Sequence, residues 1–128
     1  MNAALPYAAV AAGGAIGAVL RFVVSSLVGT RPSTLMPVSG TVVVNVVGCL
    51  LIGLAMAALP RDAANLNRLL VTGVLGSFTT FSTFSYETVL LIQSRSYVQA
   101  AANAIGSVLI GLVMVAAGLW IGSRLRGG

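Results

Sequence analysis

Four apolar stretches, each 22 to 25 residues long, make up most of this 128-residue chain. They run over Leu5–Val28, Val38–Leu59, Leu69–Ile92 and Val98–Gly122. At about 1.5 Å rise per residue, each can cross the roughly 30 Å hydrocarbon core of a bilayer as a helix. Because lipid offers no partner for backbone N–H and C=O groups, spans of this length are expected to be helical. The sequence therefore predicts one domain, residues 1–128, forming an all-α integral membrane protein with four transmembrane helices.

The composition excludes several classes of function. The chain is 58% hydrophobic and 7% charged, whereas about a quarter of the residues of a soluble domain are charged. It has no His, one Cys (Cys49) and two acids (Asp62 and Glu87), so a His/Cys metal site or a Ser-His-Asp or Cys-His catalytic site is not available within the chain. The net charge of +5 comes from dispersed Arg, without a basic stripe or interleaved aromatic residues, which argues against nucleic-acid binding and for contacts with lipid phosphates.

The connectors Gly29–Pro37, Pro60–Arg68 and Gln93–Tyr97 are short and contain Pro, Asp and Asn, which end and start helices. The first stretch lacks a basic segment before it and is too long for a signal peptide, so we expect it to be retained. One side of the membrane would hold Arg61, Arg68, Arg124 and Arg126, and the other Arg31 and Arg95. This bias is weak, and charge counting supports a single orientation and insertion in both orientations about equally.

Three of the stretches present a face of small and polar residues. These faces are Gly14, Gly17 and Arg21 in the first, Thr41, Asn45 and Gly48 in the second, and Asn103, Ser107, Gly111, Gly118 and Gly122 in the fourth. Such faces permit close helix contact, and packing alone accounts for the Gly and Ser residues. The amide of Asn45 lies in the middle of a span and needs a partner, for which an interhelical hydrogen bond is the simplest explanation.

The third stretch differs because it becomes polar halfway along. Leu69–Leu75 is apolar, and then Gly76 opens a run that ends at Glu87. Five of the seven residues from Thr79 to Ser85 carry hydroxyl groups. Hydroxyl side chains compete for backbone hydrogen bonds, and a preceding Gly loosens a helix further. Non-helical backbone at membrane depth is tolerated where it lines a cavity or binds an ion, so we predict such a helix break here.

Phe81 and Phe84 are three residues apart and so share one helix face. The positive edges of aromatic rings, together with hydroxyl and amide donors, could coordinate a small anion without trapping it. Arg21 could concentrate anions at a vestibule, or it could extend to the membrane surface. Glu87 could be a proton carrier, a surface group or a hydrogen-bonded structural anchor. A charged carboxylate in the pore would oppose an anion, which favours the anchor.

Taken together, these residues resemble the Fluc/CrcB family of fluoride channels. The likeness rests on GGAIGAVLRF at Gly13–Phe22, GTVVVNVVGCLLIG at Gly40–Gly53 and GVLGSFTTFSTFSYE at Gly73–Glu87, with a looser NAIGSVLIGL at Asn103–Leu112. The resemblance implies an antiparallel, dual-topology homodimer with a broken third helix, in the cell membrane of a bacterium or archaeon. It also implies passive export of fluoride, protection from fluoride toxicity and a structural sodium ion at the centre of the dimer.

The resemblance further assigns roles to individual residues. The fluoride pathway would be formed by Asn45, Phe81, Ser82, Thr83, Phe84 and Ser107. Arg21 would lie at the aqueous vestibule, and Glu87 would be the structural anchor. The backbone carbonyls of Gly76 and Thr79, from both subunits, would hold the sodium ion. Ser77 is a departure, since the family often has a second glycine there, and it should still permit the helix break.

Two other functions compete with a fluoride channel. A proton-coupled exporter of the small multidrug-resistance type is also a four-helix, dual-topology protein, but such exporters carry a Glu in the first span. The first span here has no acid and carries Arg21 instead, which is unfavourable beside a cation site. A structural membrane subunit without transport would use the polar faces for helix contacts alone. That function gives no joint reason for the clustered hydroxyls, the paired Phe residues and Asn45.

Overall fold

The structure, a computed structural model, describes residues 4–31, 38–60 and 62–127. Within these residues, three helices are long and apolar enough to cross a membrane: α1 (Leu5–Val28), α2 (Gly40–Ala58) and α6 (Tyr97–Arg126). The bounds of α1 are those predicted, because Pro6 lies in its first turn and Gly29 ends it at a φ of 61°. Helix α6 is longer at both ends than the predicted Val98–Gly122.

The start of the second span was predicted two residues too early. Val38 and Ser39 form strand β2, which pairs antiparallel with β1 (Thr30–Arg31). The Ser39 hydroxyl accepts a hydrogen bond from the backbone N–H of Val42 and caps α2, so the helix begins after it, at Gly40. The remainder of the first connector, residues 32–37, lies outside the described part of the chain.

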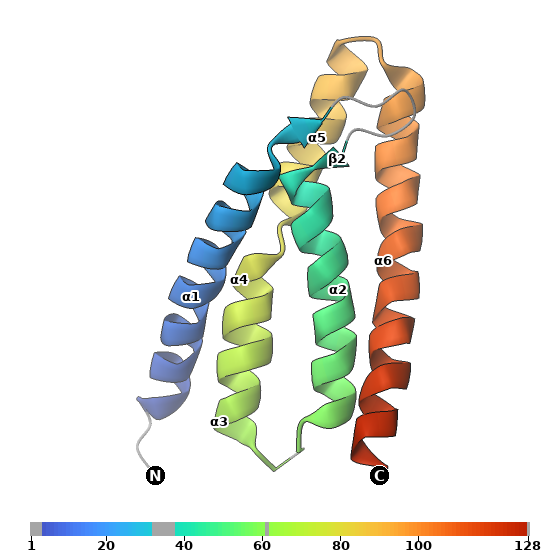
Figure 1. The fold of residues 1–128 in the computed structure, drawn as a ribbon. Helices are drawn as coiled ribbons and strands as arrows, with labels where there is room; N and C mark the ends of the chain where they lie inside the picture. Colours follow the sequence, from blue (N-terminus) through green and yellow to red (C-terminus); the bar gives the residue numbers. More distant parts are fainter. Residues whose placement is uncertain (1–3, 32–37, 61, 128) are drawn as a thin grey trace.

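The third stretch is broken, as predicted. A helical run passes through α3 (Ala64–Asn67), the π-helix η1 (Arg68–Leu75) and α4 (Gly76–Phe78), and after Thr79 and Thr80 the chain resumes as α5 (Phe81–Gln93). Figure 1 shows α3 and α4 between α1 and α2, and α5 beyond the break, toward the upper part of α6. The run begins at Ala64, inside the predicted connector Pro60–Arg68, which is therefore shorter than expected.

Gly76, which was expected to loosen the helix ahead of the predicted break, does not interrupt it. Its backbone is helical (φ −64°, ψ −30°), and its N–H still bonds to the carbonyls of the preceding helix. Extended backbone appears at Thr79 (φ −83°, ψ 157°) and Thr80 (φ −148°, ψ 113°). The break therefore lies within the predicted hydroxyl run Thr79–Ser85, at its first two residues.

Glycines bring helix backbones into direct contact at two crossings. A Cβ on Gly118 of α6 would collide with the Leu50 carbonyl of α2, and a Cβ on Gly13 of α1 would collide with the Leu69 carbonyl of η1. The small-residue face that was predicted in the fourth stretch therefore contacts α2, as expected for a face that permits close helix contact. In α1 the contact face differs in part from the prediction, because Gly13 and Gly17 meet η1 and α4, whereas a Cβ on Gly14 would meet nothing within 4 Å.

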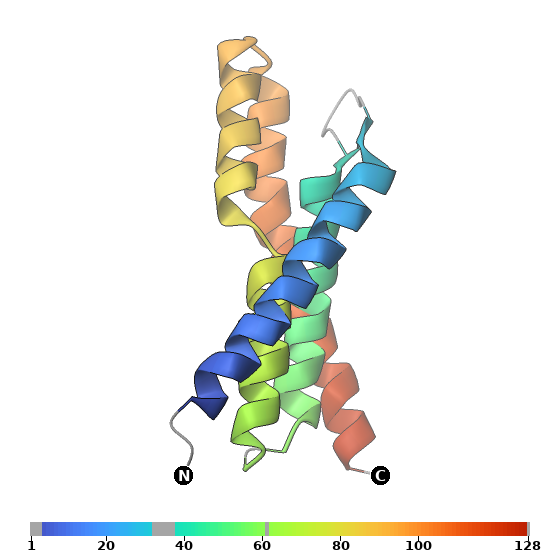
Figure 2. The same cartoon turned by 90° about the vertical axis from the view of Figure 1, so that its left-hand side faces the viewer.

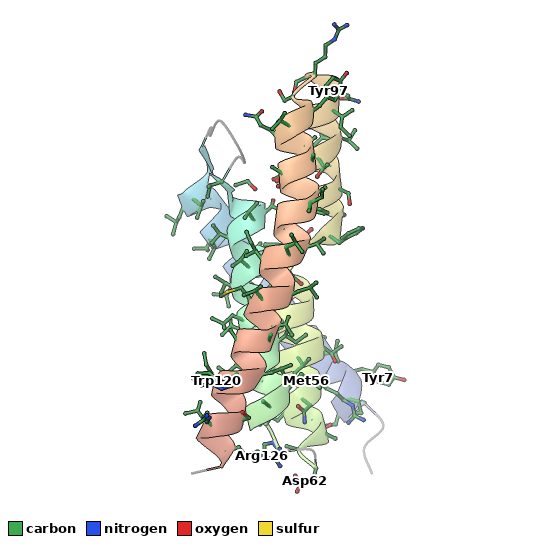
Figure 3. The ribbon with its side chains drawn as sticks, turned by 90° about the vertical axis from the view of Figure 1, so that its right-hand side faces the viewer. Tyr7, Met56, Asp62, Tyr97, Trp120 and Arg126 are labelled. Atoms are coloured by element: carbon green, nitrogen blue, oxygen red, sulfur yellow. The ribbon has the colours of Figure 1, made fainter. Side chains whose placement is uncertain are left out.

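The chain leaves most of its apolar side chains exposed. Figure 3 shows these side chains along the length of the helices, with Asp62 and Arg126 at one end and Tyr97 at the other. Figure 2 shows that α5 and the adjoining part of α6 stand apart from the upper ends of α1 and α2. No residue of α5 is buried. Such a surface fits lipid or another apolar protein face and not water, so the chain is an all-α membrane protein.

Candidate functional site

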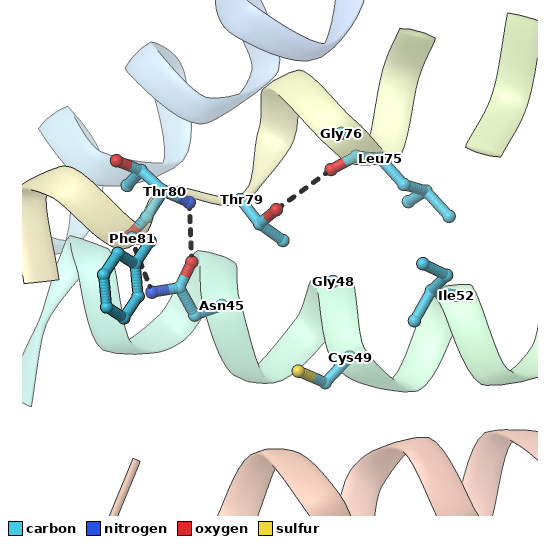
Figure 4. Close-up of a pocket in the computed structure, with 9 residues that line it drawn as sticks. All are labelled: Asn45, Gly48, Cys49, Ile52, Leu75, Gly76, Thr79, Thr80 and Phe81. Atoms are coloured by element: carbon cyan, nitrogen blue, oxygen red, sulfur yellow. Dashed lines mark hydrogen bonds between the residues drawn. The ribbon is translucent and has the colours of Figure 1, made fainter. Parts of the chain in front are cut away.

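The helix break is held by the side chain of Asn45 on α2. Its Oδ1 accepts a hydrogen bond from the Thr80 N–H at 2.8 Å, and its Nδ2 donates to the Thr80 carbonyl at 3.1 Å. Figure 4 shows both bonds. The amide thus bonds to the N–H and the carbonyl of Thr80, which in a continuous helix would bond to backbone groups four residues away in each direction. This confirms the expected interhelical hydrogen bond of Asn45 and explains how extended backbone persists at membrane depth.

A cavity of about 310 Å³ lies beside the break. Its walls come from α2 and from the two sides of the break: Asn45, Gly48, Cys49, Ile52, Leu75, Gly76, Thr79, Thr80 and Phe81. A Cβ on Gly48 would collide with the Thr79 side chain, so Gly48 permits this close approach. The predicted α2 face of Thr41, Asn45 and Gly48 therefore lies against the broken segment.

Thr80 is a site residue that the sequence interpretation did not assign. Its hydroxyl caps α5 by accepting the Thr83 N–H at 3.3 Å, and it also contacts the hydroxyls of Ser82 at 3.3 Å and Thr83 at 3.0 Å. A hydroxyl residue immediately before a resumed helix is a typical N-cap, and this was the signal available in the sequence. The predicted hydroxyls of Ser82 and Thr83 therefore form one cluster around Thr80.

The rings of Phe81 and Phe84 lie next to each other, with centroids 5.7 Å apart and planes inclined by 42°. Phe81 is 80% exposed, although it follows directly after the break and lines the cavity. Because the rings are tilted, they present edges rather than two stacked faces, and ring edges carry partial positive charge. The pair can therefore offer weak electropositive contacts without a formal charge.

A second cavity, of about 400 Å³, also has Thr80 in its lining, and we call it the vestibule. Arg21, Thr41, Thr80, Thr83 and Glu87 are among its lining residues. Glu87 takes its hydrogen bonds from hydroxyls rather than from Arg21: Ser39 donates to its Oε2 at 2.9 Å and Thr41 to its Oε1 at 2.6 Å. These two bonds tie α5 to the start of α2.

Ser107 of α6 is not brought into the Thr80 cluster. Its Oγ is buried and has no hydrogen-bond partner within the described residues. A buried hydroxyl without a partner is uncommon and calls for an explanation such as an unseen ion, water or second chain. One turn earlier, the buried side chain of Asn103 donates from Nδ2 to the Thr88 hydroxyl on α5 at 2.9 Å.

The carbonyls at the end of α4 could hold a cation. A helix leaves its last four carbonyls without intrahelical partners. Here Thr79 N–H bonds to the Leu75 carbonyl, but the next N–H, that of Thr80, bonds to Asn45. The Gly76 carbonyl therefore loses the donor that a continuous helix would supply. The described residues hold no cluster of His, Cys, Asp or Glu that could bind a metal, so any ion here would depend on backbone oxygens.

Comparisons with known proteins agree along the length of the chain. The profile of the family described as "CrcB-like protein, Camphor Resistance (CrcB)" matches residues 8–119. The chain is 44% identical over 118 residues to "Fluoride-specific ion channel FluC 1" of Streptomyces avermitilis, covering 91% of this chain and 94% of that one. It is 41% identical over 119 residues to "Fluoride-specific ion channel FluC" of Dehalococcoides mccartyi, covering 91% of each chain. It is 46% identical over 109 residues to "Fluoride-specific ion channel FluC 2" of Mycobacterium bovis, covering 84% of this chain and 83% of that one. This chain belongs to the CrcB-like family of membrane proteins.

Proposed function

We propose that this protein is a fluoride-selective channel, not an enzyme, and that it lets fluoride leave the cytoplasm passively and so lowers its toxicity. The observation that carries the proposal is the position of Thr80, which lines both the vestibule and the cavity at the helix break. The two spaces meet at one hydroxyl cluster beside the Phe pair. The names of the relatives support the choice of fluoride among small anions.

The route offers hydrogen-bond donors along its length. Arg21 raises the anion concentration in the vestibule, and the hydroxyls of Ser82 and Thr83 replace part of the hydration shell. Asn45 has two N–H donors on Nδ2 and uses one for the Thr80 carbonyl, which leaves one for an anion. The edges of Phe81 and Phe84 and the unpaired hydroxyl of Ser107 complete the pathway. Glu87 serves as the anchor, since Ser39 and Thr41 already satisfy its oxygens.

The working unit is an antiparallel, dual-topology homodimer of four-span subunits. Three observations support a second copy: the exposed ring of Phe81, the absence of any buried residue in α5 and the partnerless hydroxyl of Ser107. A partner that covers α5 would close the open side of the cavity and would give Ser107 a polar neighbour. The weak arginine bias between the two sides permits insertion in both orientations.

Efflux from liposomes tests the function. Purified protein in vesicles loaded with fluoride or chloride should release fluoride rapidly and chloride negligibly, as read with ion-selective electrodes. The matched control is the same preparation with Asn45→Leu, which removes the amide from the break. Absence of fluoride release would contradict the channel. Proton-coupled uptake of an organic cation would contradict it as well and would favour the exporter.

A sodium ion at the end of α4 fits the residues present. Carbonyl oxygens of Gly76 and Thr79 from two subunits would provide hard ligands, and the negative end of the run Ala64–Phe78 would favour a cation. Bound there, sodium would supply fixed positive charge that joins the two subunits. This charge would offset the repulsion between two helix C-termini that meet at the centre of the dimer.

Removal of sodium should therefore loosen the dimer. In detergent solutions where sodium is replaced by N-methyl-D-glucamine, we expect a lower dimer fraction and a lower unfolding temperature, and we expect sodium to restore both. Size-exclusion chromatography with light scattering measures the assembly, and circular dichroism measures the unfolding. Equal assembly and flux in both cations would show that the carbonyls hold no sodium ion.

A further inference from the structure

Helix α5 carries both Phe rings but is held loosely by apolar contacts. None of its residues is buried, and Figure 2 shows it apart from the upper ends of α1 and α2. Within one subunit, these apolar contacts alone would leave α5 free to rotate about its own axis. Rotation would turn Phe81 and Phe84 away from the break, and polar attachments within the subunit can fix the angle of α5 independently of the partner.

Two successive residues of α5 form side-chain hydrogen bonds to elements other than α5 and the break. Glu87 accepts from Ser39 and Thr41 at the start of α2, and Thr88 accepts from Asn103 of α6. Successive residues of a helix point about 100° apart, because one turn holds 3.6 residues. The two attachments therefore pull in different directions, and together they fix the rotation that either one alone would leave free.

The second attachment leads directly to Phe84. Asn103 is only 2% exposed, and its Nδ2 donates to the Thr88 Oγ1 at 2.9 Å. The same Oγ1 donates to the carbonyl of Phe84, one turn earlier, at 2.8 Å. The chain of bonds thus runs from the interior of α6 to the backbone that carries the ring. In lipid an interhelical bond of this kind has no water to compete with it.

We infer that Thr88 and Asn103 are positioning residues that fix the rotation of α5 and so aim the rings of Phe81 and Phe84. Neither residue was assigned a role in the pathway by the sequence. The inference rests on the proposed function for its transport readout only, because the orientation of the ring can be measured without conduction. Glu87 supplies the other attachment and cannot replace Thr88, since it bonds to a different helix.

Three substitutions test the link. Thr88→Val removes the hydroxyl at nearly constant shape and should lower fluoride flux about tenfold, while Thr88→Ser keeps the hydroxyl and should retain it. Thr88→Val also leaves the Asn103 amide unpaired, and Asn103→Leu removes that amide. The double variant should therefore lose no more flux than either single variant, because the same link is already absent. Thr72→Val, at an exposed hydroxyl on η1, is the matched control and should have no effect.

A second readout separates this inference from the function. With 4-fluorophenylalanine in place of Phe84, the ¹⁹F signal should shift in Thr88→Val and stay in place in Thr88→Ser, in dimeric protein. If the protein conducts no fluoride but the ¹⁹F signal shifts only in Thr88→Val, the channel function is disproved and the positioning role stands. Any of three results would overturn the inference. The ¹⁹F signal could stay unchanged in Thr88→Val, Thr88→Ser could lose as much fluoride flux as Thr88→Val, or the flux losses of the two single variants could multiply in the double variant.

Discussion

Replacement of either Phe81 or Phe84 by isoleucine is expected to lower fluoride flux about 30-fold while the protein still assembles as a dimer. Isoleucine keeps an apolar side chain of comparable bulk but has no electropositive ring edge. A desolvated cation over the face of an aromatic ring gains about 2 kcal/mol or more, and we take about 2 kcal/mol for the reverse contact, an anion at the ring edge, which corresponds to a rate factor of this size. Because Phe81 is exposed in the single chain, its loss should cost little folding stability.

The control for the ring prediction is another exposed aromatic residue far from the break. Tyr97 lies at the opposite end of α6 from Arg126 and is 62% exposed, so Tyr97→Ile should conduct like the parent. Phe81→Tyr, which keeps the ring edges, should retain more flux than Phe81→Ile. Liposome efflux gives the rates, and light scattering confirms that each variant is dimeric. If Phe81→Ile and Phe84→Ile both conduct normally, ring edges do not coordinate the anion.

The sequence was sufficient where a property depends on the local chain. The bounds of α1 followed from the apolar run Leu5–Val28, and the break followed from hydroxyls clustered in Thr79–Ser85. The adjacency of Phe81 and Phe84 followed from their spacing of three residues. In each case the residues that decide the structure belong to one uninterrupted stretch of the chain.

The sequence was insufficient where a distant group decides the structure. Asn45 is 35 residues from Thr80, and by taking the Thr80 N–H it decides where within the hydroxyl run the extended backbone lies. Thr41 was assigned to a polar face, but its partner Glu87 is 46 residues away. The π-helical form of η1 was not predicted, and its sequence contains no Pro that would mark it. The roles of Ser107, Gly76 and Thr79 depend on a second subunit and stay predictions.

Asn45 unites the two tasks of the break, since one amide both supports the backbone and offers a donor to the anion. The support task can be separated from the transport task because the amide has distinct acceptor and donor atoms. Its Oδ1 satisfies the Thr80 N–H, and one N–H of Nδ2 satisfies the Thr80 carbonyl. An acid at this position keeps the acceptor, loses both donors and adds negative charge. A leucine at this position has neither the acceptor nor the donors.

We therefore expect Asn45→Leu to abolish fluoride flux and also to lower the stability of the dimer. It leaves the N–H and the carbonyl of Thr80 without partners, at a cost of about 1–3 kcal/mol for each group. Asn45→Asp should abolish flux as well, because its carboxylate repels the anion, but it should lose less stability since the Thr80 N–H keeps an acceptor. Efflux and thermal unfolding in detergent measure the two effects on the same samples.

The matched control is Asn65→Leu, at an exposed asparagine whose contact is with the Arg68 side chain, and it should leave both quantities unchanged. The order of stabilities, parent above Asn45→Asp above Asn45→Leu, distinguishes support of the break from a purely electrostatic role. Equal stability of all three proteins would mean that the break holds itself without the amide. Normal flux in Asn45→Leu would mean that the anion passes elsewhere, because no other side chain bonds to both backbone groups of Thr80 in the described chain.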